Sequence, residues 1–175
     1  MATAICVKAG AKFSLVIPGD LPLVQGWELQ KLFSAAHAIG KGAHHVEGEG
    51  EGQGQGETND EDEDEDDGEG DGAILVPAHD HRGTNAVWRK PADLFPLQFG
   101  DDSFAPHCAA AEATGKPCVI LELAGIGLDV DSPADLRRLL ASSGDTHAQR
   151  LARAWGMEKA LAAWREPVKD VHGGN

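Results

Sequence analysis

The chain has few cysteines, no net excess of basic residues and no long apolar run. Its three cysteines (Cys6, Cys108 and Cys118) are scattered and lack zinc-site spacing, which favours free thiols in a reducing cytosol over a disulfide framework. No run approaches the roughly 18 apolar residues of a membrane helix. No charged segment followed by an apolar stretch marks an export signal. A membrane protein and a secreted small domain are therefore disfavoured, and a cytoplasmic protein is expected.

The formal charge of −14 is concentrated in one segment. Residues 47–72 contain 14 acids and 8 glycines, whereas the other residues carry 15 acids against 15 Lys plus Arg. This near-neutral remainder offers no basic surface for a nucleic acid. Because the segment has no apolar side chain to bury, we expect a disordered, glycine-rich acidic insertion. Docking of a basic partner is the functional alternative for the insertion.

Short apolar runs alternate with stretches of helical periodicity along the rest of the chain. The expected buried strands cover residues 14–18, 73–77, 85–89, 118–123 and 126–130. The expected helices cover residues 25–38, 103–114, a segment starting at Ser132, and 146–164 with a break at Gly156. This alternation is typical of an α/β fold with a mostly parallel sheet.

A single domain is expected over residues 1–175, with a C-terminal helical extension over residues 145–175. Trp155, Leu161 and Trp164 in that extension have two candidate partners. They pack either on their own domain or on a second subunit of a homodimer.

Aspartates stand near the ends of two expected strands. Asp20 follows residues 14–18, and Asp129 and Asp131 are two residues apart, so an extended backbone projects both to the same side. Ligands of open α/β sheets collect at the carboxyl ends of the strands. Three carboxylates there would suit magnesium, which prefers oxygen ligands. In the alternative interpretation, Asp20 is a turn residue and Asp131 belongs only to a helix start.

A second candidate site combines residues 80–85 with residues 99–104. Thr84 supplies a hydroxyl, Gly100 permits close approach of a ligand, and Ser103 stands at a helix start, where free N–H groups favour an anion. We therefore expect a phosphate or carboxylate between these three residues. A simple N-cap role is the alternative for Ser103.

The three histidines near these segments are His79, His81 and His107. None has metal-motif spacing to a companion, so they are interpreted as solvated or core side chains.

Four motifs in order carry a resemblance: VIPGDLPL at 16–23, DHRGTNA at 80–86, FGDDSFAPH at 99–107 and GIGLDVDSPADL at 125–136. Together they resemble the phosphoenolpyruvate/2-phospho-L-lactate guanylyltransferases. That family acts in biosynthesis of a deazaflavin coenzyme and belongs to the molybdenum-cofactor-guanylyltransferase-like nucleotidyltransferases. The resemblance implies a Rossmann-like, three-layer nucleotidyltransferase fold of the GT-A-like type.

The resemblance also implies residue roles and a reaction. The six implied residues are the ligands of two magnesium ions (Asp20, Asp129 and Asp131) and the residues that bind a phosphorylated three-carbon acid (Thr84, Gly100 and Ser103). The implied reaction transfers GMP from GTP to the phosphate of the acid and releases pyrophosphate. Since the attacking oxygen is already anionic, alignment and charge neutralisation matter more than a strong base. Arg82, Arg89 and Lys90 are candidate screening cations.

Family members begin with a strand and a basic loop that bind the nucleotide. Residues 1–12 do not resemble that loop, so the chain is expected to be N-terminally truncated relative to the family. Two alternatives to the guanylyltransferase remain open. One is a non-catalytic homologue that acts as a binding module, and the other is a nucleotidyltransferase for another nucleotide or phosphorylated acid.

Overall fold

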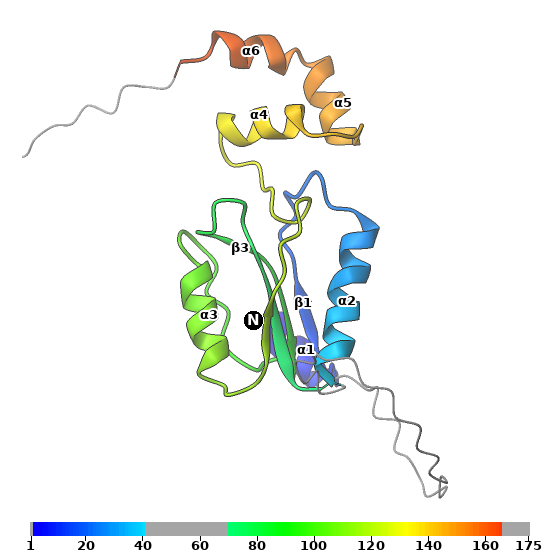
Figure 1. The fold of residues 1–175 in the computed structure, drawn as a ribbon, viewed down its shortest axis with the longest axis vertical. Helices are drawn as coiled ribbons and strands as arrows, with labels where there is room; N and C mark the ends of the chain where they lie inside the picture. Colours follow the sequence, from blue (N-terminus) through cyan, green and yellow to red (C-terminus); the bar gives the residue numbers. More distant parts are fainter. Residues whose placement is uncertain (1, 41–69, 166–175) are drawn as a thin grey trace, which may run out of the picture.

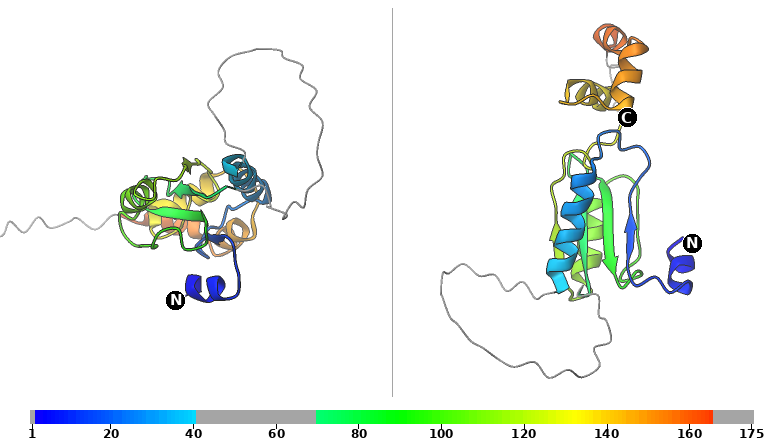
Figure 2. Two further views of the ribbon diagram at one scale, coloured as in Figure 1. Left: turned by 90° about the horizontal axis from the view of Figure 1, so that it is seen from below. Right: turned by 90° about the vertical axis from the view of Figure 1, so that its right-hand side faces the viewer.

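The computed structural model describes residues 2–40 and 70–165, which form an open sheet covered by helices on both faces (Figure 1). The strands are β1 (Ser14–Val16), β2 (Gly72–Pro77), β3 (Thr84–Lys90) and β4 (Cys118–Ile120), in the spatial order β1-β3-β2-β4. Helix α2 (Gly26–Gly40) packs on one face and α3 (Phe104–Glu112) on the other (Figure 2). The α/β architecture expected from the sequence is confirmed.

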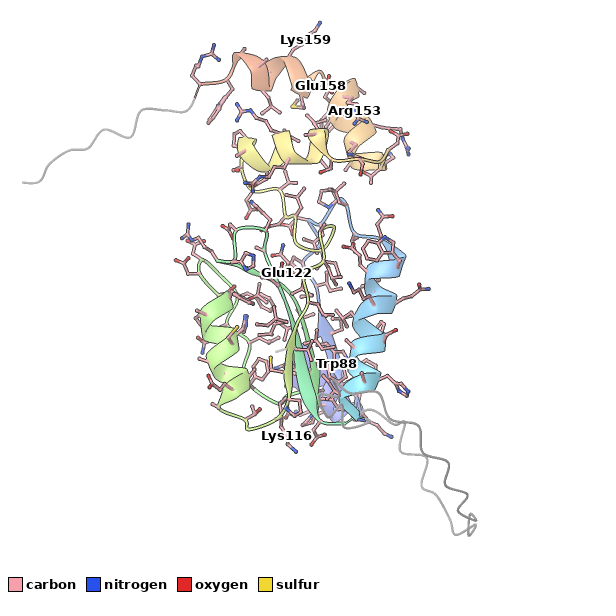
Figure 3. The ribbon with its side chains drawn as sticks, viewed as in Figure 1. Trp88, Lys116, Glu122, Arg153, Glu158 and Lys159 are labelled. Atoms are coloured by element: carbon pink, nitrogen blue, oxygen red, sulfur yellow. The ribbon has the colours of Figure 1, made fainter. Side chains whose placement is uncertain are left out.

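The core is split between the two faces of the sheet by the alternation of side chains along β2. Ile74 and Val76 face α2 and pack in a cluster that includes Trp88 (Figure 3). Ala73 and Leu75 face α3 and pack in a second cluster. Every residue of β2 and β3 is buried, as expected for strands covered on both sides.

The sheet is mixed, so the expectation of a mostly parallel sheet is wrong. Among the strands of residues 2–40 and 70–165, only β2 and β4 pair in parallel, whereas β3 pairs antiparallel with both β1 and β2. The reason is the short connection over residues 78–83, which can form a hairpin but not the long crossover that parallel neighbours need. As a result β1, β2 and β4 run in one direction, and β3 begins where those strands end.

Residues 126–130 do not form the expected strand: residues 124–127 make a turn, and residues 128–130 are irregular. The backbone of this turn forms hydrogen bonds with a side chain and with a loop. The buried Glu28 carboxylate of α2 accepts the Gly125 N–H at 2.7 Å, and the Gly127 carbonyl accepts the His79 N–H at 2.8 Å. The turn is therefore held by a side chain and a loop rather than by a neighbouring strand.

Three helices follow this turn: α4 (Pro133–Ala141), α5 (His147–Ala154) and α6 (Met157–Ala163). They lie beyond one end of the sheet (Figure 1). The predicted start at Ser132 is confirmed, because Ser132 and Asp135 form a reciprocal capping box. The predicted break at Gly156 is also confirmed, with a positive φ of 69°. Trp164 stacks on Arg137 of α4 and so packs on its own chain.

The N-terminal segment contains a short helix, α1 (Ala2–Lys8), that the sequence analysis did not anticipate. Most of the predicted acidic insertion lies outside the described residues, and its last residue, Gly72, begins β2. Residues 166–175 of the C-terminal extension also lie outside them. In residues 2–40 and 70–165, no helix has the length and apolarity to cross a bilayer.

The turn at Gly125 leaves no room for a side chain, which gives a stability prediction. A Cβ atom at Gly125 would stand 2.3 Å from Glu28 Oε2 and 2.5 Å from the Leu23 carbonyl oxygen. We expect Gly125→Ala to lower the free energy of unfolding by about 1–3 kcal/mol, because backbone must move. Urea unfolding followed by circular dichroism measures this.

The matched control is Gly26→Ala, since a Cβ at the first residue of α2 meets nothing within 4 Å. Its expected effect lies between zero and a gain of about 0.5–1 kcal/mol from lower chain entropy in the unfolded state. Equal stability of the two variants would contradict the close packing at Gly125.

Candidate functional site: an acidic cavity at the carboxyl ends of the strands

A cavity of about 570 Å³ lies where β1, β2 and the turn after β4 meet the start of β3. In Figure 3, Glu122, just after β4, lies near the end of the sheet that faces α4, and Lys116, just before β4, lies at the opposite end. All six candidate residues line this one cavity: Asp20, Thr84, Gly100, Ser103, Asp129 and Asp131. The structure therefore brings together residues that are up to 111 positions apart in the chain (Asp20 to Asp131).

The reversed strand β3 explains how Thr84 reaches this cavity. Thr84 is the first residue of β3 and therefore stands at the carboxyl ends of β1 and β2. Asp20 enters from the loop after β1, and Asp129 and Asp131 enter from the segment before α4. Asp129 and Asp131 thus face one cavity, although the strand expected to present them does not form.

Thr84 and Ser103 form one wall of the cavity and are bonded to each other. The Thr84 N–H donates to Ser103 Oγ at 3.0 Å, and both residues are almost fully buried, with 4% and 3% of their surface exposed. Ser103 precedes α3, yet its side chain makes no capping hydrogen bond. Ser103 therefore occupies the N-cap position of α3, but its side chain bonds to Thr84 and not to the helix.

Gly100 continues this wall in a conformation that favours glycine. Its φ is +141°, a region that residues with a Cβ atom rarely adopt, and nothing lies within 4 Å of the position of a Cβ. The backbone at Gly100 thus borders open space in the cavity.

His107 lies behind the wall formed by Thr84 and Ser103, called here the hydroxyl wall. Only 1% of its surface is exposed, and its Nδ1 lies 2.9 Å from Thr84 Oγ1. Its Nε2 accepts the backbone N–H of Gln98 at 3.0 Å. Burial, followed by the positive charge of Arg89, lowers the pKa of His107. The interpretation of His107 as a core histidine is correct, whereas His79 and His81 are exposed.

A second part of the cavity lining carries carboxylates. Asn85 Nδ2 donates to the Ile126 carbonyl at 3.0 Å and to Asp129 Oδ1 at 3.3 Å, so β3 fixes the position of Asp129. The pKa of Asp131 is raised, first by desolvation and then by the negative charges of Asp129 and Asp20. The other two predicted metal ligands thus both act electrostatically on Asp131.

These carboxylates do not form a closed metal cage. Within the described ranges, no three His, Cys, Asp or Glu side chains are gathered tightly enough to hold a metal ion. The donor set nevertheless fits magnesium, which keeps several waters and is usually bound by one or two carboxylates together with phosphates of the substrate.

The cavity is strongly acidic. Seven of its lining residues carry carboxylates: Asp20, Asp80, Asp101, Asp102, Asp129, Asp131 and Asp135. Arg82 is the one Lys or Arg among the lining residues that the structure describes, and its guanidinium pairs with Asp102 through two hydrogen bonds. Of the three candidate screening cations, Arg89 and Lys90 are buried on β3 and do not line the cavity.

The sequence analysis missed two contributions to the site. His107 follows Ser103 by four residues, a spacing that puts both on one side of α3 and could have linked them. Asp135, which the sequence analysis did not single out, caps α4 and also lines the cavity, where it lies 3.5 Å from His79 Nε2. No local pattern separates that second role from capping.

The fold and the cavity define an α/β protein with an acidic cavity at the carboxyl ends of its strands. The chain is 30% identical to a phosphoenolpyruvate guanylyltransferase of Rubrobacter xylanophilus over 146 residues, which are 83% of this chain and 56% of the relative. A phosphoenolpyruvate guanylyltransferase of a Roseiflexus species is 38% identical over 56% of this chain and 44% of its own length. A 2-phospho-L-lactate guanylyltransferase of Methanosarcina barkeri is 29% identical over 43% of this chain and 36% of its own length.

The chain belongs to the phosphoenolpyruvate/2-phospho-L-lactate guanylyltransferase family. No protein-family model matches it. The chain spans about half the length of the curated relatives that it matches.

The lowered pKa of His107 gives a pH prediction. In the unfolded chain this imidazole is protonated near pH 6.5. In the folded protein its pKa is lower, because burial disfavours the charged ring. The unfolded state therefore binds more protons, so the free energy of unfolding falls as the pH drops below about 6.5 and the loss levels off below the folded-state pKa. Urea unfolding from about pH 8 to about pH 5 tests this.

His107→Gln should lack this part of the pH dependence. The control is His37→Gln, which replaces an exposed histidine of α2 and should keep the wild-type slope. An unchanged slope in His107→Gln would show that the imidazole is not protected from protonation.

Proposed function

We propose that the chain acts in guanylyl transfer from GTP to phosphoenolpyruvate or 2-phospho-L-lactate, with release of pyrophosphate, in biosynthesis of the deazaflavin coenzyme F(420). Two observations support this: the family of the chain and the division of the cavity into a hydroxyl wall and a carboxylate wall. The second observation carries the proposal, because the reaction must hold an anionic acceptor beside a cation. Since the chain spans about half of each relative, the complete reaction is a proposal for this chain.

The hydroxyl wall is suited to the acceptor acid. Thr84 and Ser103 would donate to phosphate or carboxylate oxygens, while the open backbone at Gly100 lets the ligand approach. The buried position of both hydroxyls fixes their geometry before a ligand arrives. Such preorganisation lowers the entropy that binding would otherwise cost.

The carboxylate wall calls for a cation. The whole cavity has seven carboxylates against one ion-paired Arg82, and it would repel an anionic substrate. Asp20, Asp129 and Asp131 are the proposed magnesium ligands. When bound there, magnesium would neutralise charge on the α-phosphate and on the leaving pyrophosphate.

The proposed step is an in-line displacement that these residues align. An oxygen of the acceptor phosphate attacks the α-phosphorus of GTP, a new P–O bond forms, and the bond to the β-phosphate oxygen breaks with its electron pair leaving on pyrophosphate. No proton needs to be removed from the ionised acceptor oxygen. The residues of this chain therefore contribute orientation and charge compensation rather than general-base catalysis.

Asp131→Asn should change stability in opposite directions with and without magnesium. Without metal, the melting temperature should rise, because the substitution removes a charge whose desolvation, together with repulsion by Asp129 and Asp20, raises the pKa of Asp131. Saturating magnesium should raise the wild-type melting temperature by roughly 5 °C or more, and the variant should lose most of that shift. Differential scanning calorimetry with and without magnesium measures both effects.

The control for this comparison is Glu112→Gln, which removes an exposed carboxylate at the end of α3, outside the cavity. It should keep the wild-type response to magnesium. A full magnesium shift in Asp131→Asn would remove this residue from the proposed ligand set.

Pyrophosphate release from GTP, phosphoenolpyruvate and magnesium tests the reaction itself. We expect magnesium-dependent release by the purified chain and at least a roughly 100-fold loss in Asp129→Asn, because this carboxylate is held at the cavity wall by Asn85. Glu112→Gln should retain activity. No release by the folded wild-type chain would reject it as a self-sufficient transferase, and equal rates in Asp129→Asn and wild type would reject the role of Asp129.

A further inference from the structure

The buried imidazole of His107 is in hydrogen-bond contact with the hydroxyl of Thr84, which lines the cavity. Two contacts fix the ring. The backbone N–H of Gln98 points at Nε2 over 3.0 Å, and Thr84 Oγ1 lies 2.9 Å from Nδ1. A backbone N–H can only donate, so Nε2 must be the unprotonated acceptor of a neutral ring.

The ring proton then stands on Nδ1 and points at Thr84. Thr84 Oγ1 accepts this proton, so the hydroxyl hydrogen of Thr84 cannot also point at the imidazole. That hydrogen is available on the side of Thr84 that lines the cavity. A hydrogen-bond acceptor in the cavity would satisfy it.

Ser103 repeats the arrangement. Its Oγ accepts the Thr84 N–H at 3.0 Å and makes no capping bond to α3. The hydroxyl hydrogen of Ser103 is therefore also available toward the cavity that it lines. The two hydroxyl oxygens already accept hydrogen bonds from the protein, so both hydroxyls can donate. Two adjacent donors match an oxyanion such as a phosphate or carboxylate group.

The ring is also held in place by packing. The ring of His107 makes an edge contact with the ring of Phe99, with 5.1 Å between their centroids. Its centroid lies 6.5 Å from that of Phe95. Phe99 itself lines the cavity, so the ring of His107 packs against a residue of the cavity wall. Rotation of the imidazole would break both hydrogen bonds at once.

We infer that His107 is a positioning residue that makes Thr84 a hydrogen-bond donor to the acidic group of the acceptor substrate. The inference rests on the proposed function for the identity of that substrate, but the hydrogen-bond pattern itself does not. His107 acts through Thr84 and does not touch the substrate. Loss of the Nδ1–H donor should therefore weaken anion binding specifically.

Two substitutions separate this role from a structural one. His107→Asn keeps an amide N–H near the position of Nδ1 but gives up the acceptor for Gln98. His107→Gln reaches toward Gln98 but leaves Thr84 without its donor. Each variant breaks one buried hydrogen bond, so a purely structural role predicts similar losses of stability and of binding in both.

The experiment measures binding of inorganic phosphate and of phosphoenolpyruvate to the full chain by calorimetry in the presence of magnesium. We expect affinity within about threefold of wild type for His107→Asn and about tenfold or more weaker for His107→Gln and Thr84→Val. Thr84→Ser, which keeps a hydroxyl, should stay near wild type. The exposed-site variant His37→Asn is the control for histidine replacement.

Nitrogen-15 NMR of the imidazole tests the tautomer without any ligand. A proton on Nδ1 of His107 is expected, and a proton on Nε2 would overturn the inference, as would equal losses of affinity in the Asn and Gln variants. Wild-type chain that binds phosphate but not phosphoenolpyruvate would contradict the proposed function and leave the role of His107 standing. Binding of neither probe would overturn both.

Discussion

The reversal of β3 within the sheet is the constraint on which the candidate site depends. The connection over residues 78–83 is too short for a crossover, so β3 must return beside β2. Its first residues, Thr84 and Asn85, therefore lie at the end where β1, β2 and β4 finish. From there Thr84 reaches Ser103, and Asn85 reaches Asp129. One reversed strand thus connects both walls of the cavity.

The two walls differ in how firmly they are held. Thr84 and Ser103 are buried and hydrogen-bonded, whereas Asp20 and Asp131 are exposed and repel each other. A buried hydroxyl with fixed partners loses little freedom when a ligand binds. The repulsion between exposed carboxylates of like charge would be offset by a bound cation such as the proposed magnesium.

Much of the architecture could be predicted because it follows from local chemistry. The apolar run of β2 and the capping box at Ser132 are readable from neighbouring residues. The turn after β4 could not be read in this way, because its stability comes from the buried carboxylate of Glu28, 97 positions away from Gly125. The same applies to the raised pKa of Asp131, which follows from desolvation first and then from charges that include Asp20 of the loop after β1. The mixed sheet, in contrast, was readable from the six-residue connection before β3.

The long-range contacts that the sequence did not reveal are also those that orient the candidate residues. Glu28 fixes the backbone from which Asp129 and Asp131 extend, and His107 fixes the proton of the hydroxyl that Thr84 presents. Motifs record the groups that face a ligand, because those groups must be of a given chemical type. The supporting groups need only supply a donor or acceptor at the right point, so several residue types at several positions could serve. A reading from motifs therefore finds the two walls of the cavity before it finds what holds them in place.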